Sequence, residues 1–333
     1  MTWEISPYTS EQRETWNAFV AAGRASSFLF DRRYMDYHAP RFRDGSLMAR
    51  RDGKLMAVLP ANITGSTLHS HQGLTYGGWV LAPRGLDTTE VFHLWHRWIE
   101  YCREAGITEI DYKPLPTIYS PMPSQEDRYL LALSGATMSA CNIASALNLT
   151  CKPGLNTLQR RHLRHTPADY RHMAFSGNCP EAVDAFHRML TACLAERHDA
   201  RPVHSADELA RLMEEFPENI VLWLAYVGGR PAGAVCVYLN PGCVHCQYIA
   251  TTPAGRDSNI LTPLFCDMMA YYKSKGYIYF DFGTSNEDGG RLLNAGLNRQ
   301  KTSYGASGVA YERWTINVSS ALESLPTSLW PAP

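Results

Sequence analysis

The residues of this chain best suited to chemistry follow an apolar segment near its C-terminal end. Residues 277–282 read as a buried strand, and residues 283–290 are small and polar and framed by glycines. Asp281 and Glu287 offer carboxylates that can receive a proton from an amine, and Lys301 offers a charge that can stabilise an oxyanion or hold a phosphate. We expect substrate-binding donors at Thr284, Ser285, Asn286 and Tyr304. Ligands bind beyond the carboxyl ends of strands in open α/β sheets, so we predict a site here rather than a helix-capping loop with a surface lysine.

A second polar cluster lies in the first half of the chain, at residues 68–79. Its three glycines would let a backbone or a ligand approach closely. His69 and His71 have the spacing of a strand and would share one face. Two histidines rarely hold a metal without a third ligand, so we predict no metal site. Two interpretations stay open: a structural turn, or a substrate-binding wall formed by His69, His71 and Tyr76.

The most basic part of the chain is the run 158–165, which contains Arg160, Arg161 and Arg164. Guanidinium groups match phosphate oxygens well, so these arginines are candidates for contacting a phosphate or a tRNA. The alternative interpretation is a solvated helix face.

Composition bounds the class of protein. With 333 residues, two domains are expected, and 45% hydrophobic and 19% charged residues are ordinary for a soluble globular chain. The net charge of −1 creates no global field for nucleic acid or anionic membrane, so we expect no DNA partner. No apolar run approaches the length of a bilayer span, and no signal peptide is visible at the N-terminus. We expect no membrane insertion.

The cysteines favour a reducing compartment. Nine cysteines, an odd number, do not suggest a disulfide framework, and reduced thiols in the cytoplasm are the simplest interpretation. Cys243 and Cys246 form a CxxC pair on the expected strand 243–251, which would point their side chains to opposite faces. Because there is no second pair, we predict ordinary strand cysteines rather than a metal or redox site.

The same order of elements occurs twice. The hairpin 46–63, with an Asp-Gly turn, leads to a helix, a glycine stop and the buried strand 107–112, which carries one Asp. The hairpin 221–239, with a Gly-Gly turn, leads in the same way to the strand 277–282. A repeat of well over a hundred residues indicates two domains of one fold. The predicted fold class is therefore α/β (α+β), with two mixed sheets in tandem, each flanked by helices.

We place the N-terminal domain at residues 1–145 and a basic connecting segment at 146–175. The C-terminal domain, with the polar site, follows at 176–318, and a poorly ordered tail at 319–333. Within the first domain, residues 129–133 resemble a closing strand.

These motifs resemble the tandem acyltransferases of the Gcn5-related (GNAT) superfamily, and most closely the Fem-like aminoacyltransferases and the related FemAB-like and BioF2-like acetyltransferases. Residues 280–285 and 300–306 carry the resemblance, which covers roughly residues 20–316. It implies two GNAT-like domains and acyl transfer to an amine through a ternary complex, with no covalent enzyme intermediate. Lys301 matches the lysine that Fem-like enzymes place near the donor. The resemblance implies no tightly bound cofactor.

One segment departs from the superfamily pattern. Users of acetyl-CoA carry a glycine-rich loop whose amides cradle the pyrophosphate, and the matching residues 252–259 lack that spacing. We therefore expect an aminoacyl-tRNA or another carrier as donor, with acyl-CoA as the alternative. The expected acceptor is an amine of a small molecule, a peptide or a cell-envelope precursor. A third interpretation is a non-catalytic tRNA-binding or scaffold protein of this fold. The oligomeric state does not follow from the sequence.

Overall fold

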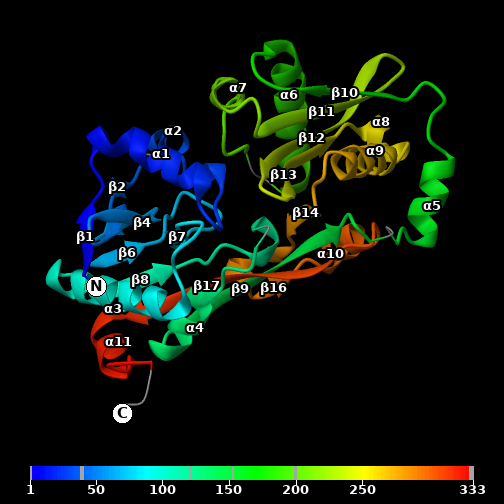
Figure 1. Ribbon diagram of the computed structural model, residues 1–333. Helices are drawn as coiled ribbons and strands as arrows, with labels where there is room; N and C mark the ends of the chain where they lie inside the picture. The colour runs from blue at the N-terminus through cyan, green and yellow to red at the C-terminus, as the bar shows by residue number, and fades with distance from the viewer. Residues whose placement is uncertain (1, 38–40, 121, 152–153, 199–200, 330–333) are drawn as a thin grey trace. The chain divides into compact units, whose positions relative to one another are not determined.

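The computed structural model describes residues 2–37, 41–120, 122–151, 154–198 and 201–329 (Figure 1). The chain divides into two compact units. Unit 1 comprises Met1–Asn142, Asp288–Leu292 and Ala310–Pro333, and unit 2 comprises Ile143–Glu287 and Leu293–Val309. The two units are described separately.

Unit 1 contains two groups of strands. Strands β1, β3, β4 and β7 form an antiparallel sheet. In the second group, β8 pairs parallel with β6 and antiparallel with β17, and β5 joins β6 to β2. The strands are β1 (Trp3–Pro7), β2 (Arg43–Asp44), β3 (Leu47–Arg51), β4 (Lys54–Leu59), β5 (Asn62–Thr64), β6 (Thr67–His69), β7 (Val80–Leu81) and β8 (Glu109–Tyr112). The helices are α1 (Arg13–Ala22), α2 (Arg32–Tyr37), α3 (Thr88–Glu104), α4 (Glu126–Leu133) and α11 (Val318–Ser324).

Helix α3 organises the core of unit 1. Asp87 caps its first turn by accepting a hydrogen bond from the Glu90 amide, and Gly106 follows its end with a φ of 75°. Trp95 and Trp98 lie on its apolar face and are almost fully buried. Helix α11 packs beside α3 and contributes Val318 and Ala321 to the same core (Figure 1). The predicted tail from residue 319 is therefore wrong for this segment, because a short amphipathic helix buries its apolar side.

Unit 2 is built on strands in the order β10, β11, β12, β13, β14 and β9, all antiparallel to their neighbours except the parallel pair β13 and β14. Its strands are β10 (Arg171–Phe175), β11 (Ile220–Val227), β12 (Arg230–Asn240), β13 (Cys243–Thr251) and β14 (Tyr279–Thr284). Its helices are α5 (Thr157–Arg164), α6 (Pro180–His198), α7 (Ala206–Glu215), α8 (Pro253–Asp257), α9 (Leu261–Ser274) and α10 (Ala295–Thr302).

Helices cover both faces of this sheet (Figure 1). Helix α9 packs on the face that bears Trp223, whose indole donates to the Tyr272 hydroxyl. On the opposite face, Phe186 of α6 contacts the ring of Tyr248. The layers are therefore helix, sheet and helix, as expected for a sheet with two apolar faces.

Two long strands contribute to both units. Residues 137–142 of β9 (Thr137–Asn148) belong to unit 1 and residues 143–148 to unit 2; residues 307–309 of β17 (Ser307–Asn317) belong to unit 2 and residues 310–317 to unit 1. The hairpin β15 (Asn286–Glu287) and β16 (Leu292–Leu293) forms a separate two-stranded sheet. The two units thus differ from the predicted ranges, because the end of the chain belongs to unit 1 and residues 146–175 belong to unit 2.

One local prediction is wrong, and one strand was not predicted. Residues 129–133 lie in helix α4 rather than in a closing strand. The strand that follows it is β9, which begins in the segment we assigned to the domain end and the connection. Its weakly β-forming sequence, rich in Ser, Ala and Asn, hid it from pattern analysis. The CxxC residues lie on β13 as predicted, both are buried, and all nine cysteines are free.

The repeat itself is confirmed. Strands β8 and β14 each pair parallel with the strand on one side and antiparallel with the strand on the other.

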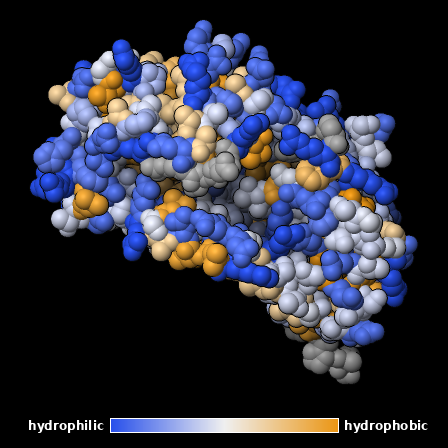
Figure 2. All heavy atoms as spheres, turned by 180° about the vertical axis from the view of Figure 1, so that it is seen from behind, coloured by the Kyte–Doolittle hydropathy of each residue, from blue (hydrophilic) through white to orange (hydrophobic). Residues whose placement is uncertain are grey.

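The face shown in Figure 2 is mostly hydrophilic, with hydrophobic side chains in small separate groups. None of the helices in the described part of the chain combines the length and the apolar character needed to cross a membrane.

Candidate functional site

A histidine–aspartate pair, with its aspartate buried, lies at the equivalent register position in both units. In unit 2, His245 faces Asp281 across the parallel β13–β14 register, with 2.7 Å between Nδ1 and Oδ2. In unit 1, His69 faces Asp111 across β6 and β8, with 2.8 Å between the same atoms. Each histidine is the third residue paired in its strand, and each aspartate is its register partner. Asp111 and Asp281, the single aspartates of the two buried strands, therefore occupy equivalent positions and each binds a histidine.

Asp281 is fully buried. Its Oδ1 accepts a hydrogen bond of 2.8 Å from the amide of Gly283, and its Oδ2 holds His245. Gly283 has a φ of 73°, and a Cβ there would lie 3.3 Å from Cε1 of His245, so this turn favours glycine. The predicted carboxylate of Asp281 is therefore not exposed to solvent, and its side-chain partner is His245.

The side chain of Lys301 lies at the carboxyl end of β14. Its ammonium donates to the carbonyl oxygens of Gly283, at 3.0 Å, and Thr284, at 2.5 Å. Burial lowers the pKa of Lys301 to about 8, and the charge of Asp281 partly opposes that effect. Only 6% of the residue is exposed, so Lys301 is a buried residue and the alternative of a surface lysine is wrong.

The rest of the polar run divides into separate contacts. Asn286 accepts a hydrogen bond of 2.6 Å from the backbone amide of Ile143, which ties the run to β9. Glu287 is exposed and accepts a hydrogen bond from Asn294. The buried hydroxyl of Ser285 has no hydrogen-bond partner among the described residues. Asp281, Thr284 and Lys301 therefore gather at the end of β14, whereas Asn286 and Glu287 anchor the hairpin that follows.

An open cavity of about 570 Å³, which we call the α9 cavity, lies in unit 2. Helix α5, the end of β13, the segment 252–262 and the end of α10 form its walls. It is lined by Asn156, Leu158, Gln159, His162, Thr251, Gly255, Arg256, Asn259, Ile260, Leu261, Thr262, Arg299, Gln300, Ser303 and Tyr304. Arg256 is held by Glu196 at 2.8 Å, whereas the Arg299 guanidinium has no side-chain partner within the described residues.

Hydrogen bonds fix the polar wall of the α9 cavity. Gln159 donates to the Ser303 hydroxyl at 2.9 Å and accepts from the Thr262 hydroxyl at 2.7 Å. Tyr304 stacks on Phe282, with ring centroids 5.5 Å apart, and burial raises the pKa of its hydroxyl to about 12. These contacts join α5, α9 and α10, so the wall presents amide and hydroxyl groups in set positions.

The segment 252–259 forms helix α8 instead of an open anion-binding loop. Thr252 caps it by accepting from the Gly255 amide at 3.0 Å. The amides of Arg256, Asn259, Ile260 and Thr262 all donate to carbonyls within the same segment. Amides used in this way are not directed at a ligand.

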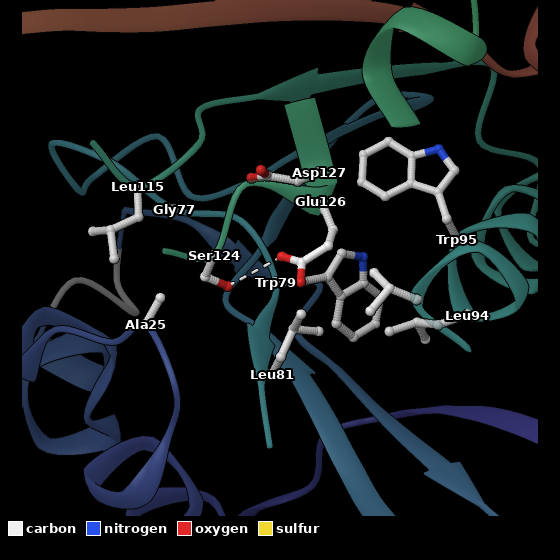
Figure 3. Close-up of a pocket in the computed structure, with 11 residues that line it drawn as sticks. Ala25, Gly77, Trp79, Leu81, Leu94, Trp95, Leu115, Ser124, Glu126 and Asp127 are labelled. Atoms are coloured by element: carbon white, nitrogen blue, oxygen red, sulfur yellow. Dashed lines mark hydrogen bonds between the residues drawn. The ribbon is translucent and has the colours of Figure 1, made fainter. Parts of the chain in front are cut away.

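A cavity beside helices α3 and α4 of unit 1 is much smaller. Helices α3 and α4 flank β8 in the chain as α9 and α10 flank β14, but the space beside them is a cavity of only about 20 Å³, room for about one water. Figure 3 shows the rings of Trp79 and Trp95 and the carboxylates of Glu126 and Asp127 around it. Of these two regions, only that of unit 2 can take a small molecule.

The predicted residues of the first half lie in unit 1. Strand β6 ends at His69, and His71 has a φ of 70°, so the two histidines do not share one strand face. Tyr76 is buried against Tyr119 and Phe30, with ring centroids 4.6 and 6.1 Å apart, which is a packing role. His69 lines a polar cavity of unit 1.

The three predicted arginines lie on α5, whose other face contributes to the α9 cavity. Arg160, Arg161 and Arg164 are exposed and do not belong to the cavity lining; the Arg160 guanidinium donates to the Thr157 hydroxyl. A phosphate-binding role for them stays a prediction.

Sequence analysis missed His245, Gln159 and Thr262. A signal for His245 was present: Thr67-Leu68-His69 and Cys243-Val244-His245 both end in histidine, and both precede a strand with one Asp. The other two are ordinary polar residues on helices, and only their packing shows that they form one network.

The family model described as an acetyltransferase (GNAT) domain matches residues 158–288. The chain is similar in structure to FemX, with a TM-score of 0.67, 11% identity and coverage of 96% of this chain and 99% of that chain. It is similar to L-PGS from Bacillus licheniformis (TM-score 0.57, 12% identity, coverage 96% and 97%). It is also similar to a tandem GNAT protein from the clavulanic acid biosynthesis pathway (TM-score 0.52, 15% identity, coverage 95% and 99%). No curated protein matches the sequence significantly.

At these identities the likeness to solved structures shows the fold. It confirms the predicted tandem of GNAT-like α/β domains, and the family match lies over the half that holds the α9 cavity. Residues 158–288 of this chain therefore match the acetyltransferase (GNAT) domain model, and the chain has the tandem GNAT fold over nearly its whole length.

Proposed function

We propose that this protein transfers an acyl or aminoacyl group from an activated carrier to an amine, with the donor bound in the α9 cavity. One observation carries the proposal: unit 2, which contains nearly all of the residues that match the GNAT domain model, holds an open cavity of about 570 Å³ with a fixed polar wall. That volume lies within the range of about 300–1,000 Å³ typical of small-molecule sites. Acyl transfer without a covalent intermediate needs positioning, removal of a proton from the amine and stabilisation of the oxyanion.

We assign the proton transfer to His245. Asp281 accepts from its Nδ1 at 2.7 Å, which leaves the lone pair on Nε2 and orients the ring. The carboxylate of Asp281 would also stabilise the imidazolium that forms when the ring receives a proton. Asp281 then acts as a positioning residue. Glu287, exposed and bound to Asn294, is the weaker choice.

Lys301 is proposed to act at the donor. Its ammonium donates to two carbonyls at the end of β14, and we propose that its third proton stabilises the charge that develops on the donor carbonyl. The same two hydrogen bonds hold the backbone of Gly283 and Thr284, which follows Asp281. Lys301 would therefore also fix the position of this turn during acyl transfer.

The choice of donor rests on the segment 252–259. The amides of Gly255, Arg256, Asn259, Ile260 and Thr262 are used within α8 and the turn after it, so they are not free to cradle a CoA pyrophosphate. This favours an aminoacyl-tRNA or another carrier, in agreement with the Fem-like motifs. The exposed arginines of α5 are then suited to tRNA phosphates outside the cavity.

A blocking substitution tests the donor site. Leu158 lines the α9 cavity and is 53% exposed, so Leu158→Trp should fill space without disturbing the core. Leu163, 38% exposed on the same helix and outside the cavity lining, provides the matched control Leu163→Trp. Binding of alanyl-tRNA, uncharged tRNA and acetyl-CoA would be measured for each protein.

We expect Leu158→Trp to weaken binding of alanyl-tRNA by roughly tenfold or more relative to Leu163→Trp, with no tight binding of acetyl-CoA to either. Submicromolar acetyl-CoA binding that Leu158→Trp removes would replace the proposed donor with acyl-CoA. Equal binding of every donor by both variants would show that the α9 cavity is not the donor site.

A further inference from the structure

A second open cavity lies in unit 1, around the carboxylate of Asp111. It has a volume of about 530 Å³, and we call it the β8 cavity. Its charged and titratable lining comprises His69, Glu109, Asp111, Asp288, Arg291 and Arg313. None of these residues lies in the α9 cavity, which belongs to unit 2. The acyl transfer proposed above leaves the β8 cavity without a role.

The inner wall of this cavity is a fixed triad. Asp111 is 5% exposed. Its carboxylate accepts hydrogen bonds from Nε and Nη2 of Arg313, at 2.6 and 2.7 Å, and from Nδ1 of His69, at 2.8 Å. Burial would raise the pKa of Asp111, but the hydrogen bonds from Arg313 and His69 outweigh it and lower that pKa, so the carboxylate stays charged. Two groups remain for a ligand: Nε2 of His69 as an acceptor and Nη1 of Arg313 as a donor.

The outer wall carries charges of both signs. Glu109, Asp288 and Arg291 are exposed, and within the described residues none of their side chains has a hydrogen bond or an ion pair. The triad is close to neutral by itself, so these three side chains set the charge that a ligand would meet. A guanidinium and two carboxylates around one cavity match a ligand that carries both an ammonium and a carboxylate.

The hairpin tip that supplies two of these groups is held in place. Asp288, Gly289 and Gly290 have φ values of 49°, 60° and 97°, and the Arg291 amide donates to the Asp288 carbonyl at 3.1 Å. A Cβ at Gly290 would lie 2.6 Å from Oδ1 of Asn142, so the backbone approaches β9 too closely for a side chain. The tip therefore presents Asp288 and Arg291 from a defined turn.

We propose that the β8 cavity binds a small zwitterion, a compound with an ammonium and a carboxylate a few bonds apart, of which a free α-amino acid is the simplest case. Arg291 and Nη1 of Arg313 bind the carboxylate. Glu109, Asp288 and Nε2 of His69 bind the ammonium. A phosphate or another polyanion fits less well, because it would face two unpaired carboxylates.

Calorimetry on the full chain tests this, with no acyl donor present, so the outcome is independent of the proposed transfer. The probes are glycine, L-alanine and L-lysine, with acetate and methylamine as the two halves of the zwitterion and inorganic phosphate as the competing anion. We expect at least one amino acid to bind with a Kd of about 1 mM or tighter, and each half to bind at least tenfold more weakly.

Two exposed residues allow the test without loss of folding. Arg291→Gln and Glu109→Gln should each weaken amino-acid binding by roughly tenfold or more, the effect of losing one charge-assisted hydrogen bond. Arg103→Gln, an exposed arginine on α3 in the same unit, is the control and should bind as the parent protein does. The proposal is overturned if no amino acid binds, if acetate, methylamine or phosphate binds as tightly, or if the two variants match the control.

Discussion

Asp127 gives the most quantitative prediction. Its carboxylate lines the small closed cavity of unit 1 shown in Figure 3, with Tyr112 donating at 3.3 Å and the Arg128 amide at 2.8 Å. Burial raises its pKa from 3.8 to about 6, although the charge of Arg128 and both hydrogen bonds oppose the change. The folded protein therefore binds more protons than the unfolded chain between these two pH values.

The sign and size of the effect follow from linkage. A carboxyl with a raised pKa contributes stability that is fully present below pH 3.8 and is lost as pH rises through about 6. From those two pKa values, the charge of Asp127 destabilises the folded protein by about 1.6 kcal/mol at pH 5 and about 3 kcal/mol at pH 7.5. Because 19% of the side chain is exposed and partly screened, these are upper values.

Asp127→Asn removes the charge and keeps the shape and the acceptor oxygen. We expect the variant to be more stable than the parent at pH 7.5, with the difference shrinking by about half at pH 5. Urea unfolding followed by tryptophan fluorescence is suited to this measurement, because Trp79 and Trp95 line the same cavity.

Glu126→Gln is the matched control. It removes a charge from the next residue, but Glu126 is paired with Arg24 at 2.8 Å, so we expect no stabilisation. The reasoning is refuted if Asp127→Asn is no more stable than the parent at pH 7.5, or if its advantage is the same at both pH values.

Two further predictions concern unit 2. Lys301→Met loses both hydrogen bonds to the carbonyls at the end of β14, so we expect a loss of about 1–3 kcal/mol in stability and of about 100-fold or more in turnover. Melting curves and initial rates check both, with exposed Lys273→Met as control. An unchanged melting temperature would contradict its buried position, and full turnover would contradict its proposed role. Changing the three α5 arginines to Gln should lower the affinity for tRNA. It should also reduce the slope of log K against log salt by about 0.7–0.9 for each phosphate that is no longer neutralised. The control double variant Arg84→Gln with Arg103→Gln should change neither quantity, and an equal slope in all three proteins would show that α5 is a solvated helix face.

The sequence by itself determined the repeat and most of its elements. The turns at Asp52-Gly53 and Gly228-Gly229 have positive φ values at both positions, as two-residue hairpins require. Glycine stops follow α3 and α9, and each buried strand carries one aspartate, at Asp111 and Asp281. These features depend on residues close together in the chain, where local conformational preference decides the structure.

Only the tertiary structure decided which polar groups meet. His69 and Asp111 are 42 positions apart, and His245 and Asp281 are 36 apart, so their pairing depends on the register of parallel strands joined through a helix. The burial of Lys301 depends on how α10 packs against the end of β14, and no pattern within α10 distinguishes it from a surface lysine.

The cavities show the same division. Both units place helices beside the equivalent buried strand, yet Trp79 and Trp95 leave about 20 Å³ in unit 1, whereas Thr262 and Ser303 help to line about 570 Å³ in unit 2. The size of a cavity is set by the side chains that several elements bring together from distant parts of the sequence. Periodicity reports which face of each element is apolar, but it does not report how much space remains between those faces once they pack.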